Sequence, residues 1–315
     1  MTWLLTTLQQ FLLFSGAVLV TGCVAWRIFV APHADRGVHG PAAAALQTAE
    51  HRVARLAFAA ALVVVLGWGL RGVVQLFGFR DPFVPLREDI ELLLFQTFWG
   101  TVWMAQGVVV VALAAFLAMA LRSVTTSTLD RPPASGRIAG RLTEAALIMA
   151  LAATMAGSGH AVGVDSGRAL ALVADGLHAL AAGCWIGTLA VILTAGRPVE
   201  ASEETITLFA AQLRRFSPLA LVSGATLVSM GVALSWTHLP EVADLWRTTY
   251  GRVLASKAGL ALVVFGLGFV NWRRGLPVLD TRQGAVEVRR RAAAEVALAT
   301  GVLLLTAILV HSPKP

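Results

Sequence analysis

Charged residues are scarce in this chain, and their scarcity excludes a soluble globular protein. Of the 315 residues only 14% are charged, whereas 57% are hydrophobic, and the mean hydropathy is +0.74. This composition is typical of a polytopic membrane protein. The short alternating pattern of a membrane β-barrel is also missing, because the apolar runs are long. We therefore predict an all-α fold of transmembrane helices.

Other absences narrow the function. The two cysteines, Cys23 and Cys184, lie within apolar runs, so no disulfide framework is expected. No Walker sequence and no aspartyl-phosphate motif occurs, which argues against ATP-driven pumping by this chain alone. No serine or cysteine nucleophile has a plausible base, so the sequence gives no support for an enzyme.

Eight apolar segments reach or approach the roughly 20 residues that a helix needs to cross a hydrocarbon core. The first has no basic leader or cleavage pattern, and we expect a retained helix rather than a signal peptide. Arginines are concentrated in the odd-numbered connections, which places both termini outside, in the periplasm or its equivalent. These loops explain the net charge of +7 without a nucleic-acid partner. The segments cover about residues 4–30, 52–77, 95–121, 141–159, 169–194, 213–236, 253–271 and 292–311.

A weak internal repeat relates the two halves of the chain. An offset of 151 residues carries Gly100 onto Gly251, and an offset of 160 residues carries Arg55 onto Arg215. We predict a first four-helix repeat in residues 1–122 and 139–160, a cytoplasmic connection in 123–138, and a second repeat in 161–315. Because each repeat has an even number of helices, the two would be parallel, with a pseudo-twofold axis along the membrane normal.

The first offset also pairs residues that can carry chemistry. It carries Glu144 onto Glu295, and His160 onto His311. The two histidines would then be symmetry mates at the outer face of the membrane. The two glutamates are expected at the inner starts of their helices, where a carboxylate favourably meets the helix dipole.

Asp175 and His178 are the deepest ionisable pair. His178 lies ten residues into the fifth helix, or about 15 Å at the helical rise, and Asp175 shares its face. Ionisable groups at this depth are costly and mark functional sites, although an ion pair that locks the helix to Lys257 would be a structural alternative. Cys184 lies well round the helix from this face. Gly183 and Gly187 form a small-xxx-small pair that lets another helix approach.

Further candidate ligands lie around this pair. Imidazole with carboxylate or thioether suits copper, zinc, iron or nickel, whereas calcium and magnesium want more oxygen ligands. Neutral histidines at an outer mouth and a deeper His with Asp would suit a relay of sites for an inward-moving copper ion. The candidate metal ligands are His160, His178, His311, Asp175, His238, Met149 and Met155.

Several motifs together resemble the copper resistance protein D (CopD) family. They are Ser158-Gly159-His160-Ala161, Asp175-Gly176-Leu177-His178 with Trp185-Ile186-Gly187, Arg215-Phe216-Ser217, Tyr250-Gly251 with Lys257, Asn271-Trp272-Arg273, and Glu295. The resemblance implies a bacterial inner-membrane protein that handles copper, commonly as an importer supplied by a separate periplasmic CopC-like protein, because we expect no fused β-sandwich. It also implies roles for His160, His178 and Asp175. His311 departs from the family pattern and rests on the repeat alone.

Two other functions remain open at this point. A b-type haem electron carrier would hold its haem between histidines of neighbouring helices, but His160 and His178 are expected at different depths. A copper sensor or assembly factor would bind the ion without moving it. The copper oxidation state, the direction and energy coupling of transport and the oligomeric state are not determined by the sequence.

Overall fold

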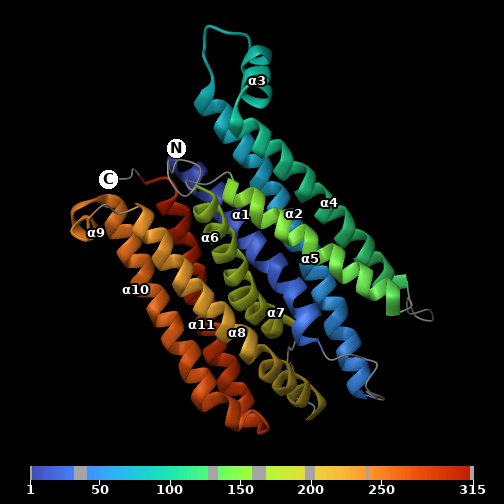
Figure 1. Cartoon of the computed structure of the whole chain (residues 1–315). Coiled ribbons are helices and arrows are strands. Elements are labelled where there is room, and N and C mark those ends of the chain that lie inside the picture. Colours follow the sequence, from blue (N-terminus) through green and yellow to red (C-terminus); the bar gives the residue numbers. More distant parts are fainter. Residues whose placement is uncertain are drawn as a thin grey trace.

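A computed structural model describes residues 2–31, 41–126, 134–157, 168–195, 203–238 and 241–312, and these ranges are helical with no strand. Eight helices within them are long and apolar enough to cross a membrane, which confirms the predicted all-α polytopic fold. Figure 1 shows the helices as one elongated bundle. The main helices are α1 Thr2–Ala25, α2 Pro41–Phe79, α4 Phe98–Thr126, α5 Ala134–Gly157, α6 Arg168–Ala182 with α7 Thr188–Ala195, α8 Glu203–His238, α10 Thr249–Val270 and α11 Arg282–Leu309.

Several of these helices begin about ten residues before the predicted apolar segments. α2 begins at Pro41, α8 at Glu203 and α11 at Arg282. The early turns carry polar residues but bury one face, for example Leu46 and Ala49 of α2. Hydropathy locates the part of a helix that lies in hydrocarbon, whereas amphipathic turns continue beyond it.

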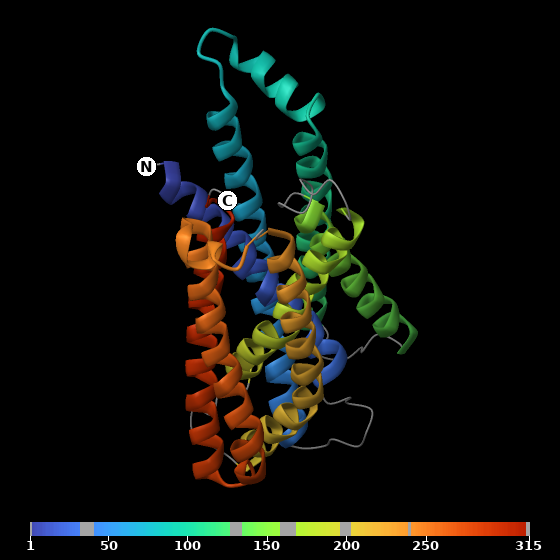
Figure 2. The same cartoon turned by 60° about the vertical axis from the view of Figure 1, so that its left-hand side comes forward.

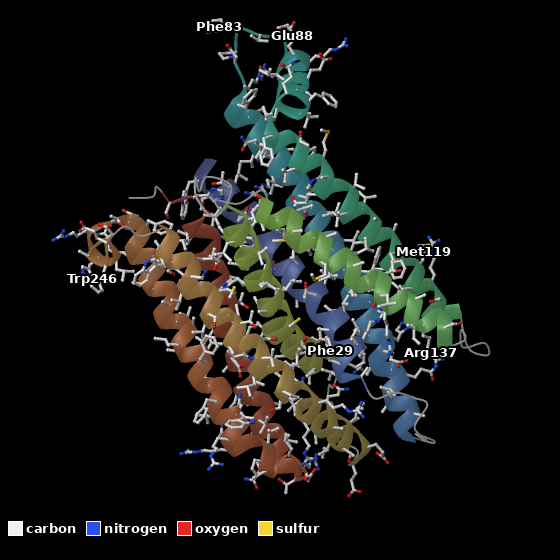
Figure 3. All side chains as sticks on the ribbon, viewed as in Figure 1. Phe29, Phe83, Glu88, Met119, Arg137 and Trp246 are labelled. Atoms are coloured by element: carbon white, nitrogen blue, oxygen red, sulfur yellow. The ribbon has the colours of Figure 1, made fainter. Side chains whose placement is uncertain are left out.

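Two short helices were not predicted, and each leads into a spanning helix. α3 (Leu86–Phe95) precedes α4, and α9 (Asp244–Arg247) precedes α10. They lie at the same end of the bundle as the start of α1 and the end of α11, and α3 projects furthest from it (Figures 1 and 2). Figure 3 places Phe83 and Glu88 on this projection and Arg137 near the opposite end.

The two junctions share one local geometry. The Thr97 hydroxyl accepts from the backbone N–H of Gly100 at 2.9 Å, and Thr248 caps Gly251 in the same way at 2.9 Å. A Cβ on either glycine would clash with the backbone of the preceding short helix. Each spanning helix is therefore capped by a threonine and packs closely against its short neighbour, which explains the glycines.

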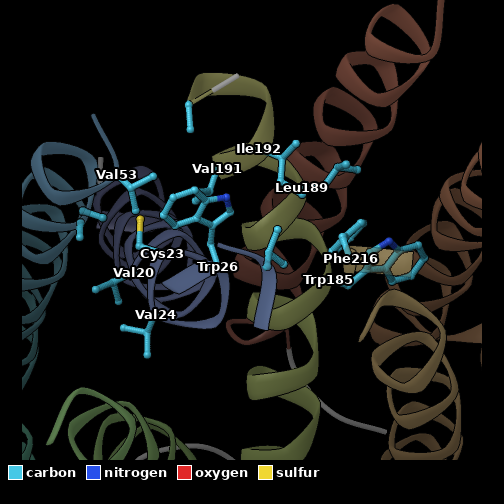
Figure 4. Packing of buried hydrophobic residues seen from close by; sticks show 14 of the residues in the cluster. Val20, Cys23, Val24, Trp26, Val53, Trp185, Leu189, Val191, Ile192 and Phe216 are labelled. Carbon is cyan, nitrogen blue, oxygen red and sulfur yellow. The ribbon is translucent and has the colours of Figure 1, made fainter. Parts of the chain in front are cut away.

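The centre of the bundle is a close crossing of α1 with the π-helical turn Gly183–Gly187 (η3), which joins α6 to α7. A Cβ on Gly22 would clash with the Gly187 backbone, and one on Gly183 with Thr21. The predicted small-residue pair thus admits α1. Large apolar residues surround the crossing, among them the fully buried Trp26 shown in Figure 4. The Trp26 indole donates to Gln212 Oε1 at 3.4 Å and links the π-helical turn after α1, Trp26–Val30, to α8.

Arginines at the end of the bundle opposite α3 hold helix ends together. Arg215 donates to the carbonyl of Ala31 at 3.1 Å, and Arg289 donates to that of Leu193 at 2.8 Å. Both carbonyls lie at or near a helix C-terminus, where unpaired acceptors and the helix dipole favour a cation. Arg215 of the Arg-Phe-Ser motif therefore has a structural role.

Glu144 and Glu295 are not at helix starts, so that expectation was wrong. Glu144 lies ten residues into α5 and Glu295 thirteen residues into α11, and both are buried. Arg27 pairs with Glu144, and Asn271 donates to Glu295 at 3.1 Å. A carboxylate at this depth requires such partners, because burial of an unpaired charge is costly.

Candidate functional site

A cavity of about 690 Å³ lies among α1, α5, α6, α8, α10 and α11. Its walls are mainly apolar, and its lining includes three ionisable residues: Asp175 and His178 of α6 and Lys257 of α10. Ala182 and Trp185 continue the same helix face along the wall, whereas Cys184 is not among the lining residues. The helical spacing used in the sequence analysis therefore identified the cavity-facing side of α6.

The cavity exists because α8 and α10 are held apart. α6 packs against α8, and α10 packs against α11, while α8 and α10 have few direct contacts with each other. In the first half of the chain, α2 and α4 pack directly, and the Trp68 and Trp103 rings stack with centroids 4.4 Å apart. The second pair of helices thus leaves a space at the depth of the membrane spans.

His178 is held against α8. A Cβ on Gly231 would lie 3.4 Å from the His178 Cε1 atom, so the imidazole occupies space that a larger residue would need. The Leu227 backbone of α8 lies close enough to act electrostatically on the ring. Its Nδ1 atom is buried and finds no partner among the residues that the structure describes. In a neutral imidazole one nitrogen carries the proton and the other has a free lone pair, so His178 can offer one nitrogen as a ligand.

Lys257 shares the cavity with this histidine. Its charge acts electrostatically on both Asp175 and His178. The opposite charges of Asp175 and Lys257 can neutralise each other in the apolar surroundings. Such pairing allows charged side chains to lie at this depth of the membrane. The three residues combine an imidazole lone pair, a carboxylate and an ammonium in one space.

Aromatic residues form the deep end of the cavity. Trp185 of η3 and Phe265 of α10 have ring centroids 4.6 Å apart. A Cβ on Gly268 would meet both the Trp185 ring, at 3.2 Å, and Glu295 Oε1, at 3.3 Å. Glu295 and Asn271 therefore lie directly behind these rings and support the floor of the cavity.

The other candidate ligands are dispersed. Met155 lines the cavity, but Met149 does not, and its side chain is 57% exposed. His311 lies outside the cavity lining, and its Nε2 atom is 3.1 Å from the Thr6 carbonyl oxygen. His238 is the last residue of α8. His160 lies outside the described residues, so the proposed pairing of His160 with His311 stays a prediction.

No group of three or more His, Cys, Asp or Glu residues that could hold a metal ion occurs in the described part of the chain. In that part, no second histidine joins His178 in the lining of the cavity. The arrangement therefore differs from a closed structural metal cage, in which four protein ligands surround the ion. It offers at most a few ligands to a passing ion.

The helical bundle and its internal polar site define a class: multi-pass α-helical membrane proteins with an ionisable cavity between their helices. Residues 210–309 match the family model described as copper resistance protein D. This part of the chain is similar to that family, as the motifs predicted. The matched region contains Lys257 and Glu295 but not Asp175 or His178.

A curated relative extends the similarity beyond this region. The chain is 26% identical over 241 residues to a protein of Bacillus subtilis (strain 168) named copper transport protein CutJ. The aligned part is 76% of this chain but only 41% of the relative, so the chain spans about two fifths of that protein's length. No solved structure matches the chain. The description of the family model refers to copper resistance, and the name of the relative refers to copper transport.

Proposed function

We propose that this protein moves copper across the bacterial inner membrane, from the periplasmic side inward, through the cavity lined by Asp175 and His178. The observation that carries the proposal is the buried His178 side chain, which lines the cavity, packs against Gly231 of α8 and leaves its Nδ1 atom without a hydrogen-bond partner among the described residues. A neutral imidazole nitrogen without a hydrogen-bond partner is available as a metal ligand.

The neighbours of His178 suit an ion that binds briefly. Asp175 supplies a carboxylate, and Met155 of α5 supplies a thioether to the same cavity. Transport requires sites that are favourable enough to enter and weak enough to leave. The ammonium of Lys257 weakens the attraction of the Asp175 carboxylate for a cation, and a copper ion has to compete with it.

Entry from the outside follows from the predicted orientation. Arginines concentrate at the end of the bundle opposite α3 and α9, which the positive-inside rule assigns to the cytoplasm. The end with α9 and His311 would then face the periplasm, and copper would arrive there from a CopC-like protein. His160, His238 and His311 remain candidate outer ligands.

The name of the CutJ relative supports copper transport, and the CopD match supports copper handling. A copper sensor or assembly factor would use the same ligands without releasing the ion inward. A b-type haem carrier needs two axial ligands, and no described residue besides His178 offers an imidazole in the cavity.

The test is copper accumulation by cells that express His178→Ala or Asp175→Asn. We expect both substitutions to reduce accumulation to the level of cells without the protein, because each removes a ligand. Cys184→Ala is the matched control, since Cys184 lies on the same helix segment but off the cavity.

The competing explanation is a structural lock between Asp175 and Lys257. In that case Asp175→Asn and Lys257→Met would each lower the unfolding temperature, and His178→Ala would leave uptake intact. Normal uptake by His178→Ala at a normal protein level would therefore refute the transport site.

A further inference from the structure

The cavity has an opening that an ion cannot use. Val228 and Val232 of α8 and Leu262 of α10 line it, yet they are 49%, 59% and 71% exposed. All three lie within segments long and apolar enough to span a membrane. The gap between α8 and α10 therefore opens where hydrocarbon surrounds the protein. Because a bare ion is very costly to place in hydrocarbon, metal transport does not explain this opening.

The polarity of the lining changes along the gap. Lys257 lies eight residues into α10, about 12 Å at the helical rise, and Asp175 lies seven residues into α6. Both belong to the part of the cavity nearer to α9. Further along the helices than His178, the lining residues are apolar except for Thr21 of α1, and they include Trp185, Ile186 and Phe265.

We propose that this gap is a phospholipid site: one acyl chain enters between α8 and α10, and oxygens of its ester or phosphate group meet the Lys257 ammonium. The lipid comes from the leaflet nearer to α9. An amphiphile of this orientation has its polar group at the level of Lys257 and its hydrocarbon along the apolar lining, which matches the polarity of the walls. An ammonium has three donors, so an interaction with Asp175 leaves donors for the lipid.

The shape of the space favours a single chain over a helix of another molecule. Lining residues extend inward to Ala17 and Thr21 of α1 and to Ala299 of α11, so the gap reaches the centre of the bundle. A second copy of the protein could cover the exposed valines but could not fill this recess. A volume of about 690 Å³ lies within the range of small-molecule pockets.

The lipid would complete the wall of the cavity. With a chain in place, the exposed side of the gap is hydrocarbon, and the lipid separates Asp175 and His178 from the surrounding bilayer. The lipid site goes beyond the proposed function and stands whether or not copper passes.

The experiment uses the full chain in vesicles of phosphatidylethanolamine and phosphatidylglycerol with a trace of phosphatidylglycerol that carries a diazirine in its acyl chain. After irradiation, labelled peptides are identified by mass spectrometry. We expect label on the cavity-facing peptides around Trp185 and Leu227. The double variant Val232→Trp with Leu262→Trp narrows the gap, and label on these peptides should fall to the background seen on α2.

The matched control is Val222→Trp with Val263→Trp, on the same two helices. Both residues are exposed, and neither lines the cavity. This variant should be labelled like the parent protein. Equal labelling of both double variants, or of neither, would overturn the proposal. The readout needs no copper, so its failure is distinguishable from a failure of transport.

Native mass spectrometry of the unmodified protein provides a second measurement that does not depend on folding of a variant. One retained phospholipid per chain supports the site, and Lys257→Met should reduce its retention. A retained isoprenoid quinone in place of phospholipid, or a lipid-free dimer, would refute it.

Discussion

The helix pair α2–α4 in the first half and the pair α8–α10 in the second half correspond in the predicted repeat, but the first pair is packed and the second encloses a cavity. Trp68 and Trp103 fill the space between α2 and α4, and each indole donates to the other residue's carbonyl, at 2.9 and 3.1 Å. Gly72 lies against Trp103, and Gly107 lies against Trp68.

The repeat offsets identify the residues that replace this pair. Trp68 corresponds to Val228, and Trp103 corresponds to Leu254, both of which line the cavity. Gly72 and Gly107 correspond to Val232 and Ala258, which also line it. In the predicted repeat, the two indoles have no counterpart in the second half, and the larger residues at the glycine positions fill only part of the space.

A polar difference accompanies the difference in volume. Gln106 of α4 corresponds to Lys257 of α10. Gln106 is fully buried, and both of its amide atoms lack a partner among the described residues, whereas Lys257 faces the cavity with Asp175 and His178. The pair α2–α4 is therefore closely packed, whereas the pair α8–α10 borders a cavity that contains three ionisable residues.

Transfer of the tryptophans to the second half should have the largest effect. In Val228→Trp with Leu254→Trp, the indoles would occupy the cavity, and we expect copper accumulation to fall to the level of cells without the protein. The protein level and monodispersity should stay normal, because α2 and α4 accept the same pair. Val222→Trp, outside the cavity, is the control. Retained accumulation in the filled variant would show that copper does not use this cavity.

The reverse transfer should affect stability. Trp68→Val with Trp103→Leu removes a stacked pair and two interhelical hydrogen bonds, and we expect a loss of roughly 2–4 kcal/mol per site. Thermal unfolding in detergent measures it. Trp246→Leu on α9 is the control, since Trp246 is exposed and its loss should change stability by less than about 0.5 kcal/mol. A double variant as stable as the parent would mean that the indoles do not hold the first half together.

The sequence predicted the spans better than the elements between them. Crossing hydrocarbon imposes one condition on about 20 residues, so hydropathy found all eight spans. α3 and α9 are short and carry no such constraint. Their signal was the Thr-x-x-Gly pattern at Thr97 and Thr248, which marks a cap but does not show what precedes it.

The site was predictable in part for a similar reason. Helical spacing placed Asp175 and His178 on one face, and Lys257 was recognised as a partner, because few ionisable residues lie in the spans. The cavity itself depends on the distance between α8 and α10, which no local pattern encodes. Spacing also could not tell which face of α5 meets the bundle, and Met149 lies on the exposed one.

Glu144 in the first half and Glu295 in the second half differ in the kind of residue that partners them. Glu144 pairs with a cation, Arg27, and both side chains are largely buried, at 4% and 19% exposed. Glu295 instead accepts from the neutral amide of Asn271. Glu144→Gln leaves the guanidinium without its counter-charge and should cost about 3–5 kcal/mol, whereas Glu295→Gln keeps a polar partner and should cost about 1 kcal/mol.

Chemical or thermal unfolding of the two variants in the same detergent measures this difference. Arg27→Gln with Glu144→Gln is the internal control, and it should be more stable than Glu144→Gln alone, because no unpaired charge remains. If Glu295→Gln proves the more damaging of the two, the charge of Glu295 has a role that its hydrogen bond to Asn271 does not explain. Because Glu295 lies behind Trp185, copper accumulation by Glu295→Gln would be measured next. That measurement separates a residue that only supports the cavity floor from one that takes part in the copper path.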